Sequence, residues 1–195
     1  MLDVFKEKII NLPDDIQSKI TILNSNMTDF KLPKKYSLII APFHVFQLLT
    51  NENDIKNCLN CIKEHLVSNG VFIVNVFRPE GILNNSWCSD EKIQWEQFDP
   101  KTGNHVVKKD VRERIDTKNQ ILFAWIIYEI TNKKGNTERI IEELELKYYY
   151  YEQLKTLLIE NYFIITEEYG WYDKSEIQTG RELIFVCRSK GTDGE

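Results

Sequence analysis

Polar side chains follow two apolar runs that have the length of buried strands. His44 comes shortly after the run Leu38–Ala41, and Asn75 and Arg78 lie at the end of a second run, Val71–Phe77. In a βαβ unit the carboxyl ends of both parallel strands meet at one sheet edge, where such folds bind ligands. An imidazole there can act as a general base or orient an amine or hydroxyl acceptor, because histidine side chains titrate near neutral pH. The alternative is that His44 is a helix-start or surface residue.

The chain has four cysteines, two of which form a Cys-x-x-Cys pair inside a helical pattern. Zinc sites normally need a second closely spaced pair, and Cys88 and Cys187 lie far from Cys58 and Cys61 in the sequence. We therefore predict core and helix-face cysteines and no metal site, with a metal or redox role for the pair as the alternative. Reduced thiols without a disulfide framework are typical of a cytoplasmic protein.

Length and composition describe one ordinary globular domain, or one domain with a sizeable insertion. Of the 195 residues 42% are hydrophobic and 28% charged, and the net charge of −5 argues against a nucleic-acid partner. No apolar run approaches the roughly 20 residues that a membrane span needs, and the charged N-terminus is unlike a signal peptide. The densest basic cluster is interrupted by acids, which predicts a solvated strand face: Lys108, Lys109, Arg112 and Arg114 alternate with Asp110, Glu113 and Asp116.

The spacing of apolar residues predicts the elements that position these side chains. A first helix over residues 2–12 ends at Pro13, and residues 19–23 are a short strand candidate. A crossover helix is predicted over residues 52–67, where apolar residues recur at intervals of four, three and four. Gly70 then lies where a helix usually ends and a strand begins.

After Pro79 the pattern changes to that of an antiparallel sheet. Residues 80–100 have the composition of a loop, and residues 104–150 alternate as three antiparallel strands with one solvated face. A helix at 151–161 and two strands at 163–169 and 182–187 follow. We therefore expect a partial α/β core in residues 1–80, an antiparallel β insertion or cap in 81–150, a helix and strand pair that complete the core sheet in 151–190, and a tail in 191–195.

These runs together resemble the class I methyltransferases that use S-adenosylmethionine, in particular a bacterial branch with an antiparallel insertion after the fifth strand. MLDVFKEKI is similar to the helix after the family's second strand, NMTDF to the segment after its third, KYSLIIAPFHVFQLL to its fourth strand and HLVSNGVFIVNVFRP to its fifth. FDPKTGNHVV is similar to the insertion, and ELKYYYYEQLKTLLIENYFIITEEYG and ELIFVCRSK to the return helix and last strands. The resemblance covers residues 1–188 and implies a truncated Rossmann-like sheet, mostly parallel with an antiparallel C-terminal strand pair.

Two parts of the family pattern have no counterpart in the sequence. No glycine precedes Gly70, so the glycine-rich loop that approaches the amino-acid part of the cofactor is missing. The acid that closes the family's second strand and holds the ribose hydroxyls is missing too. We therefore expect weak or no S-adenosylmethionine binding by the isolated chain, with the N-terminal segment truncated or supplied by another polypeptide. The strand at Tyr36–Ala41 would then have an unpaired apolar edge, and such edges recruit partners.

The resemblance also implies positions for the cofactor. Asn26 and Met27 would frame the adenine, with the Asn26 carbonyl where the family has an acid. Ala41 and Phe43 would lie where the sulfonium meets the methyl acceptor. An Asn-rich turn is the alternative at Asn26, and core packing is the alternative at Phe43. The acid that the family often has at Asn75 is replaced, which changes a polar contact near the substrate.

For the acceptor we expect a small molecule bound beneath the insertion, with His44 as the candidate catalytic residue. Arg78, Trp95 and Tyr149 are candidates to line its pocket, although packing explains the run of four tyrosines equally well. Methyl transfer needs little acid–base help, so the alignment of the nucleophile and the exclusion of water are the protein's main tasks.

We therefore interpret the chain as a methyltransferase-like protein that is incomplete by itself. The alternative is a non-catalytic remnant, or an interaction module that forms a homodimer through the exposed strand edge. A flavodoxin-like or other nucleotide-binding domain is a third hypothesis, against which the antiparallel segment speaks. Nothing in the sequence distinguishes carbon, nitrogen and oxygen acceptors.

Overall fold

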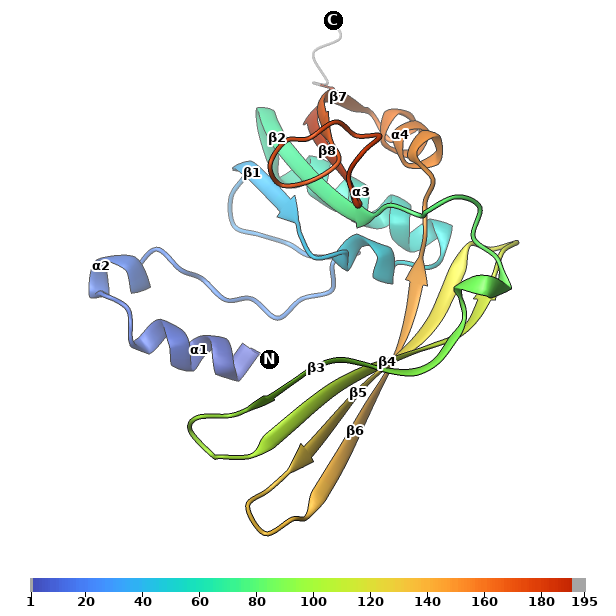
Figure 1. Cartoon of the computed structure of the whole chain (residues 1–195). Coiled ribbons are helices and arrows are strands. Elements are labelled where there is room, and N and C mark those ends of the chain that lie inside the picture. Colours follow the sequence, from blue (N-terminus) through green and yellow to red (C-terminus); the bar gives the residue numbers. More distant parts are fainter. Residues whose placement is uncertain (1, 191–195) are drawn as a thin grey trace, which may run out of the picture.

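A computed structural model describes residues 2–190, which form two four-stranded sheets and the helices around them (Figure 1). Sheet A has the strand order β1-β2-β8-β7, and sheet B has the order β3-β4-β5-β6. The strands of sheet A are β1 (Tyr36–Ala41), β2 (Leu66–Phe77), β8 (Glu182–Ser189) and β7 (Phe163–Tyr169). Those of sheet B are β3 (Ser89–Phe98), β4 (His105–Asp116), β5 (Ile121–Thr131) and β6 (Thr137–Lys147).

Sheet A begins with the predicted βαβ unit. β1 and β2 run parallel, and α3 (Glu52–His65) crosses between them. The Asn51 side chain accepts a hydrogen bond from the Asp54 backbone N–H at 2.9 Å, which satisfies a free donor of the first helical turn. The helix ends short of the predicted residue 67, because β2 begins at Leu66 and Ser68–Gly70 continue that strand.

The prediction of a mostly parallel sheet is not met among the described strands. β2 pairs antiparallel with β8, and β8 pairs antiparallel with β7, so β1–β2 is the one parallel pairing that the described part of sheet A contains. The C-terminal strand pair is antiparallel, as predicted. A loop and no crossover helix joins β7 to β8, and antiparallel pairing follows from so direct a connection.

One face of sheet A packs against α3 and α4 (Tyr151–Glu160) and forms the hydrophobic core (Figure 1). Phe72 of β2 and Phe185 of β8 are fully buried on this face, against Leu59 of α3 and Leu158 of α4. Burial of one such side chain contributes about 1.5–3 kcal/mol. This layer therefore holds the strand ends of the candidate site in place.

The opposite face of sheet A is only partly covered. Ile39 and Ala41 of β1 pack against the core, so Leu38 and Ile40 point to the opposite face, where they are 51% and 56% exposed. Among the described strands β1 pairs with β2 alone and lies at the edge of the sheet. The predicted apolar strand edge is therefore present, beside an apolar surface.

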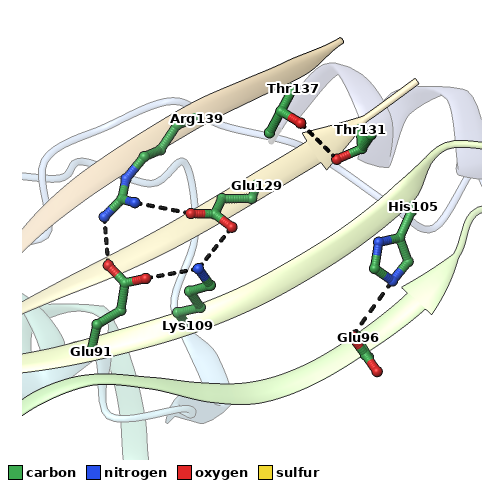
Figure 2. A network of polar contacts seen from close by, with 8 residues as sticks. All are labelled: Glu91, Glu96, His105, Lys109, Glu129, Thr131, Thr137 and Arg139. Atoms are coloured by element: carbon green, nitrogen blue, oxygen red, sulfur yellow. Dashed lines mark hydrogen bonds and ion pairs between the residues drawn. The ribbon is translucent and has the colours of Figure 1, made fainter. Parts of the chain in front are cut away.

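Sheet B is an antiparallel ribbon that extends away from sheet A (Figure 1). Its strands β4 to β6 are the predicted three, whereas β3 lies in the stretch for which a loop was expected. β3 is mostly exposed and carries charged residues on both faces, so it lacks the alternation of a half-buried strand. Ion pairs join β3 to the sheet: Glu91 contacts Lys109 and Arg139, and both of these contact Glu129 (Figure 2).

The two helices that precede β1 lie apart from α3 and α4 (Figure 1), whereas Met27 and Phe30, between these helices and β1, pack against the core. α1 (Leu2–Ile10) confirms the predicted first helix, and α2 (Asp14–Gln17) follows it. The predicted strand at residues 19–23 is wrong. The Lys19 backbone N–H closes a turn onto the Ile16 carbonyl, and the residues after it pair with no described strand.

Two short 3-10 helices complete the described part of the chain, η1 (Val45–Leu48) and η2 (Asn85–Trp87). The predicted tail, residues 191–195, lies outside the described residues. Within residues 2–190 no helix is long and apolar enough to cross a membrane.

Candidate functional site

The chain changes direction at the carboxyl end of β1, where two consecutive residues adopt the left-handed backbone conformation. Phe43 and His44 have φ angles of 54° and 61°, which residues with a side chain rarely adopt. Residues in this conformation are strained and persist only where surrounding contacts stabilise them. They are concentrated at functional sites. The turn leads into η1 and leaves Phe43 84% exposed. Core packing at Phe43, the alternative from the sequence, is therefore wrong.

The His44 ring lies against a buried carboxylate from the far end of the chain. Its Nε2 is 2.9 Å and 2.8 Å from the two carboxylate oxygens of Glu182, the first residue of β8. Glu182 is only 6% exposed. Asn75 of β2 donates its side-chain amide to Glu182 Oε2 at 2.9 Å and to the Tyr172 hydroxyl at 3.1 Å. Four segments thus contribute one polar chain of residues, Tyr172–Asn75–Glu182–His44.

The chemistry of the donors and acceptors in this polar chain assigns the protons. A buried carboxylate is costly unless hydrogen bonds satisfy it, and Glu182 receives them from Asn75 and His44. Because an ionised carboxylate only accepts, the short contacts with Glu182 favour the proton of His44 on Nε2. His44 Nδ1 has no hydrogen-bond partner among residues 2–190. Although most of the Tyr172 side chain is exposed, partial desolvation of its hydroxyl and then the nearby Glu182 charge raise the pKa of the phenol.

A cavity of about 620 Å³ lies between this polar chain and sheet B. Its size suits a small molecule, and it combines apolar walls with a few convergent polar groups. Sheet A and its loops supply polar and aromatic side chains, whereas sheet B supplies mainly aliphatic ones. The lining residues are Phe43, His44, Leu48, Trp171, Tyr172 and Glu182 on the first side, and Lys108, Ile126, Leu144 and Leu146 on the second.

A second cavity of about 400 Å³ lies over the open face of sheet A. Ala41 and Pro42 line it at the end of β1, and Asn75 lines it from β2. Trp171 and Tyr172 line both cavities, so the loop between β7 and β8 lies at their common border. The predicted cofactor residues Ala41 and Phe43 therefore lie at neighbouring cavities on either side of this border.

The other two predicted cofactor residues lie in the segment before β1. Asn26 is exposed, and its side-chain oxygen accepts a hydrogen bond from the Thr28 backbone N–H at 3.0 Å. This is the Asn turn that the sequence left open as the alternative. Met27 is half-buried and packs against the core. Neither residue lines the two cavities described above.

The structure does not bring the three predicted acceptor residues together. Arg78 donates to the carbonyls of Gln178 and Gly180, and so holds the loop between β7 and β8. Trp95 lies on β3 and packs edge-on against Tyr128, with ring centroids 6.3 Å apart.

Tyr149, the third of these residues, belongs to the core. It lies against Phe46, and its hydroxyl has no hydrogen-bond partner among the described residues. Burial raises the pKa of its phenol far above the ordinary value. Neither Arg78, Trp95 nor Tyr149 lines the cavity that contains His44.

The Cys-x-x-Cys pair lies on α3, away from His44. Cys58 is buried in the core, and burial raises the pKa of its thiol to about 12. Cys61 is half-buried and donates to the Thr28 carbonyl at 3.4 Å. Within residues 2–190 no group of three or more His, Cys, Asp or Glu side chains is arranged to hold a metal ion.

Sequence reasoning missed two members of the polar chain, Glu182 and Tyr172. Glu182 is 138 positions from His44, and its position at the start of a strand gives no indication in the sequence that it contacts a histidine. Tyr172 lies in a loop next to Trp171, with no spacing that marks it. Only the pairing of β2 with β8, in which Phe77 lies opposite Glu182, brings the carboxylate to this end of the sheet.

Comparison with known proteins establishes the fold. No protein-family model and no curated protein matches the sequence. Among solved structures, the CcbJ methyltransferase from Streptomyces caelestis is 19% identical, with a TM-score of 0.74 over 97% of this chain and 75% of that one. A S-adenosylmethionine-dependent methyltransferase from Clostridium acetobutylicum is 15% identical, with a TM-score of 0.67 over 86% of this chain and 63% of that one.

A third similar structure is the sugar N-methyltransferase KedS8 from Streptoalloteichus. It is 14% identical, with a TM-score of 0.66 over 90% of this chain and 66% of that one. The chain thus spans between about three fifths and three quarters of these proteins. Its α/β architecture with two sheets is similar to the fold of these methyltransferases, which confirms the predicted resemblance at the level of the fold.

Proposed function

We propose that the chain is part of a S-adenosylmethionine-dependent methyltransferase that acts on a small-molecule acceptor. The observation that carries the proposal is the position of the cavity containing His44. In this fold it lies at the carboxyl ends of β1 and β2, where open α/β sheets bind their ligands. The methyltransferases of similar structure support the same reading.

The residues that line the border of the two cavities would hold the cofactor, which would supply an activated methyl group. Ala41 and Pro42 would lie along it, and the exposed Phe43 and Trp171 rings would face its positive charge, which aromatic faces attract. Asn26 and Met27 would frame the adenine. Because the Asn26 side-chain oxygen already accepts from Thr28, its contact to adenine competes with a turn.

The residues present fit the methyl-bearing end of the cofactor better than its other parts. Among residues 2–190 the segment before Gly70 contains no glycine, so it cannot form a backbone cradle of the kind the family uses. We therefore expect the isolated chain to bind S-adenosylmethionine weakly or not at all. A further polypeptide segment that pairs with β1 would supply the missing contacts and cover Leu38 and Ile40.

The acceptor would enter the cavity between the sheets. The aliphatic residues of sheet B would exclude water, and His44 Nδ1 would accept the proton that an amine or hydroxyl acceptor loses on methylation, while the cofactor would leave as its demethylated product. Arg78 contributes by holding the loop that carries Trp171 and Tyr172. Because KedS8 is a sugar N-methyltransferase, amino sugars are the first acceptors to test.

Calorimetric titration of the purified chain with S-adenosylmethionine, and separately with its demethylated product, tests the proposal. Binding at micromolar strength, about −8 kcal/mol, supports an at least partly formed cofactor site, and methylation of an amino-sugar panel is then measured. No binding at millimolar concentration, by this chain and by a version extended with a glycine-rich segment that pairs with β1, contradicts the proposal.

A second candidate function rests on the exposed edge of β1. Leu38 and Ile40 form an apolar strip beside unpaired strand backbone, and strand edges of this kind pair with other chains. In this alternative the chain is an interaction module that forms a homodimer through β1. Sedimentation of the wild type and of Ile40→Lys tests it: a dimer that the substitution dissociates supports pairing, and a stable wild-type monomer excludes it.

A further inference from the structure

In the polar chain Tyr172–Asn75–Glu182–His44, the partly exposed His44 ring can take part in a reaction, whereas the buried Glu182 carboxylate can only orient that ring. We propose that Glu182 is a positioning residue, which holds the Nε2–H of His44 and leaves Nδ1 as the proton acceptor toward the cavity. The catalytic role of His44 in this inference rests on the proposed function. The tautomer of His44 can be measured independently of that function.

Glu182 constrains the His44 ring at Nε2, and the described residues make no hydrogen bond to Nδ1. Nε2 lies within 2.9 Å of both Glu182 oxygens, so rotation of the ring or a change of tautomer loses both contacts. Carboxylates orient histidine rings in this way in metal sites and in catalytic triads. The His44 side chain is 36% exposed, whereas that of Glu182 is 8% exposed. The imidazole is thus accessible, and the carboxylate behind it is not.

A role in stability alone explains this burial poorly. Burying a carboxylate has a desolvation cost that a packed apolar side chain avoids, so stability does not require a carboxylate here. The acidic residues that pair with Lys109 on sheet B, Glu91 and Glu129, are more exposed than Glu182 and form their ion pairs with Lys109 and Arg139. Glu182 instead lies beside a ring at the border of a cavity.

Asn75 completes the arrangement from the other side. Its amide donates to Glu182 Oε2, and so fixes the carboxylate in the plane that His44 requires. A carboxylate in its place would face Glu182 as a like charge and weaken its hold on His44.

The loop between β7 and β8 sets the register of Glu182. Glu182 donates its backbone N–H to the Gly170 carbonyl at 2.9 Å, which closes the loop at its base. Gly170 and Gly180 approach so closely that a Cβ on either would overlap the backbone of the other. Close approach of two glycines thus holds Tyr172 and Glu182 on the same side of sheet A.

The test is the nitrogen NMR spectrum of the neutral histidine rings in the ¹⁵N-labelled chain. His65 is an internal reference, because its Nδ1 lies 2.7 Å from the Cys61 carbonyl and its Nε2 accepts from the Leu32 N–H. We expect His65 in the Nδ1–H form and His44 in the Nε2–H form. Glu182→Ala should lose the single Nε2–H form, and Glu182→Gln, which retains an accepting oxygen, should keep most of it.

The control variant is Glu168→Gln, which alters a carboxylate of β7 that contacts Lys155 and Tyr151. It should leave the His44 signals unchanged. The proposal is overturned if the wild type has His44 in the Nδ1–H form. It is also overturned if the His44 signals are unchanged in a folded Glu182→Ala variant. Glu182→Leu replaces Glu182→Ala in this test if the Ala variant does not fold. These outcomes do not depend on the cofactor, so absence of S-adenosylmethionine binding contradicts the proposed function separately. Where methyl transfer is measurable, Glu182→Ala should lower kcat roughly 100-fold with KM nearly unchanged, and Glu182→Gln should restore part of it.

Discussion

Gln47 of η1 donates its side-chain amide to the backbone carbonyl of Lys147, at the end of β6, across 2.8 Å. Its side-chain oxygen accepts from the Phe77 backbone N–H at 3.0 Å, at the end of β2. One fully buried side chain thus joins sheet A to sheet B beside the cavity that contains His44. This side chain therefore links the two sheets that form the walls of the cavity.

Gln47→Ala should lower the free energy of unfolding by about 2–4 kcal/mol, because it leaves a buried donor and a buried acceptor without partners. Urea unfolding measures the change. Gln97→Ala, on the exposed strand β3, is the matched control and should stay within about 0.5 kcal/mol of the wild type. An equal effect of both variants would mean that the contact contributes nothing specific.

Asn75→Asp should destabilise the chain more than Asn75→Ala at neutral pH. The new carboxylate would lie beside Glu182, and the repulsion raises its pKa in the folded state. A raised carboxyl pKa means that stability is retained at low pH and lost as the pH rises through that pKa. Unfolding measured between pH 4 and pH 8 should therefore show the Asp variant recovering toward the acidic end, and a pH-independent difference from the Ala variant would contradict this account.

The buried thiols predict a loss of stability in alkali. Burial raises the pKa of Cys58 and of Cys187 to about 12, from 9.0. Both groups favour the folded state in their protonated form, so their contribution is complete below pH 9 and is lost as the pH rises from 9 to 12. Tyr149 shifts in the same direction and adds to the trend. Urea unfolding at pH 8 and pH 10.5 should show a smaller loss for Cys58→Ala than for the wild type.

The ion pairs of sheet B predict a local effect on β3 (Figure 2). Hydrogen bonds from Lys109 and then Arg139 lower the pKa of Glu91, so its contribution is present above its ordinary pKa and is lost as the pH falls. Glu91→Gln should increase amide hydrogen exchange along β3, and high salt should reduce the difference from the wild type. Sheet A should be unaffected. Glu113→Gln, an exposed acid of β4, is the control, and an equal effect from it would contradict a specific role of the network.

Local patterns in the sequence identified much of the core. α3 and α4 have apolar residues at helical spacing because one stripe of each packs on sheet A, and the runs at β1 and β2 are apolar because the strands are buried on at least one face. His44 became a candidate for the same reason, since it comes shortly after such a run. These features depend on residues close together in the chain, so their pattern is readable without the fold.

The tertiary structure alone decided what His44 contacts and where the cavity walls lie. Glu182 reaches His44 through the pairing of β2 with β8, and Gln47 joins sheets that are far apart in sequence. β3 was missed because it is mostly exposed, and its backbone pairing with β4 and its ion pairs leave no apolar alternation in the sequence. Contacts between distant residues leave no periodicity behind, because a hydrogen bond or an ion pair requires only that two groups meet in space.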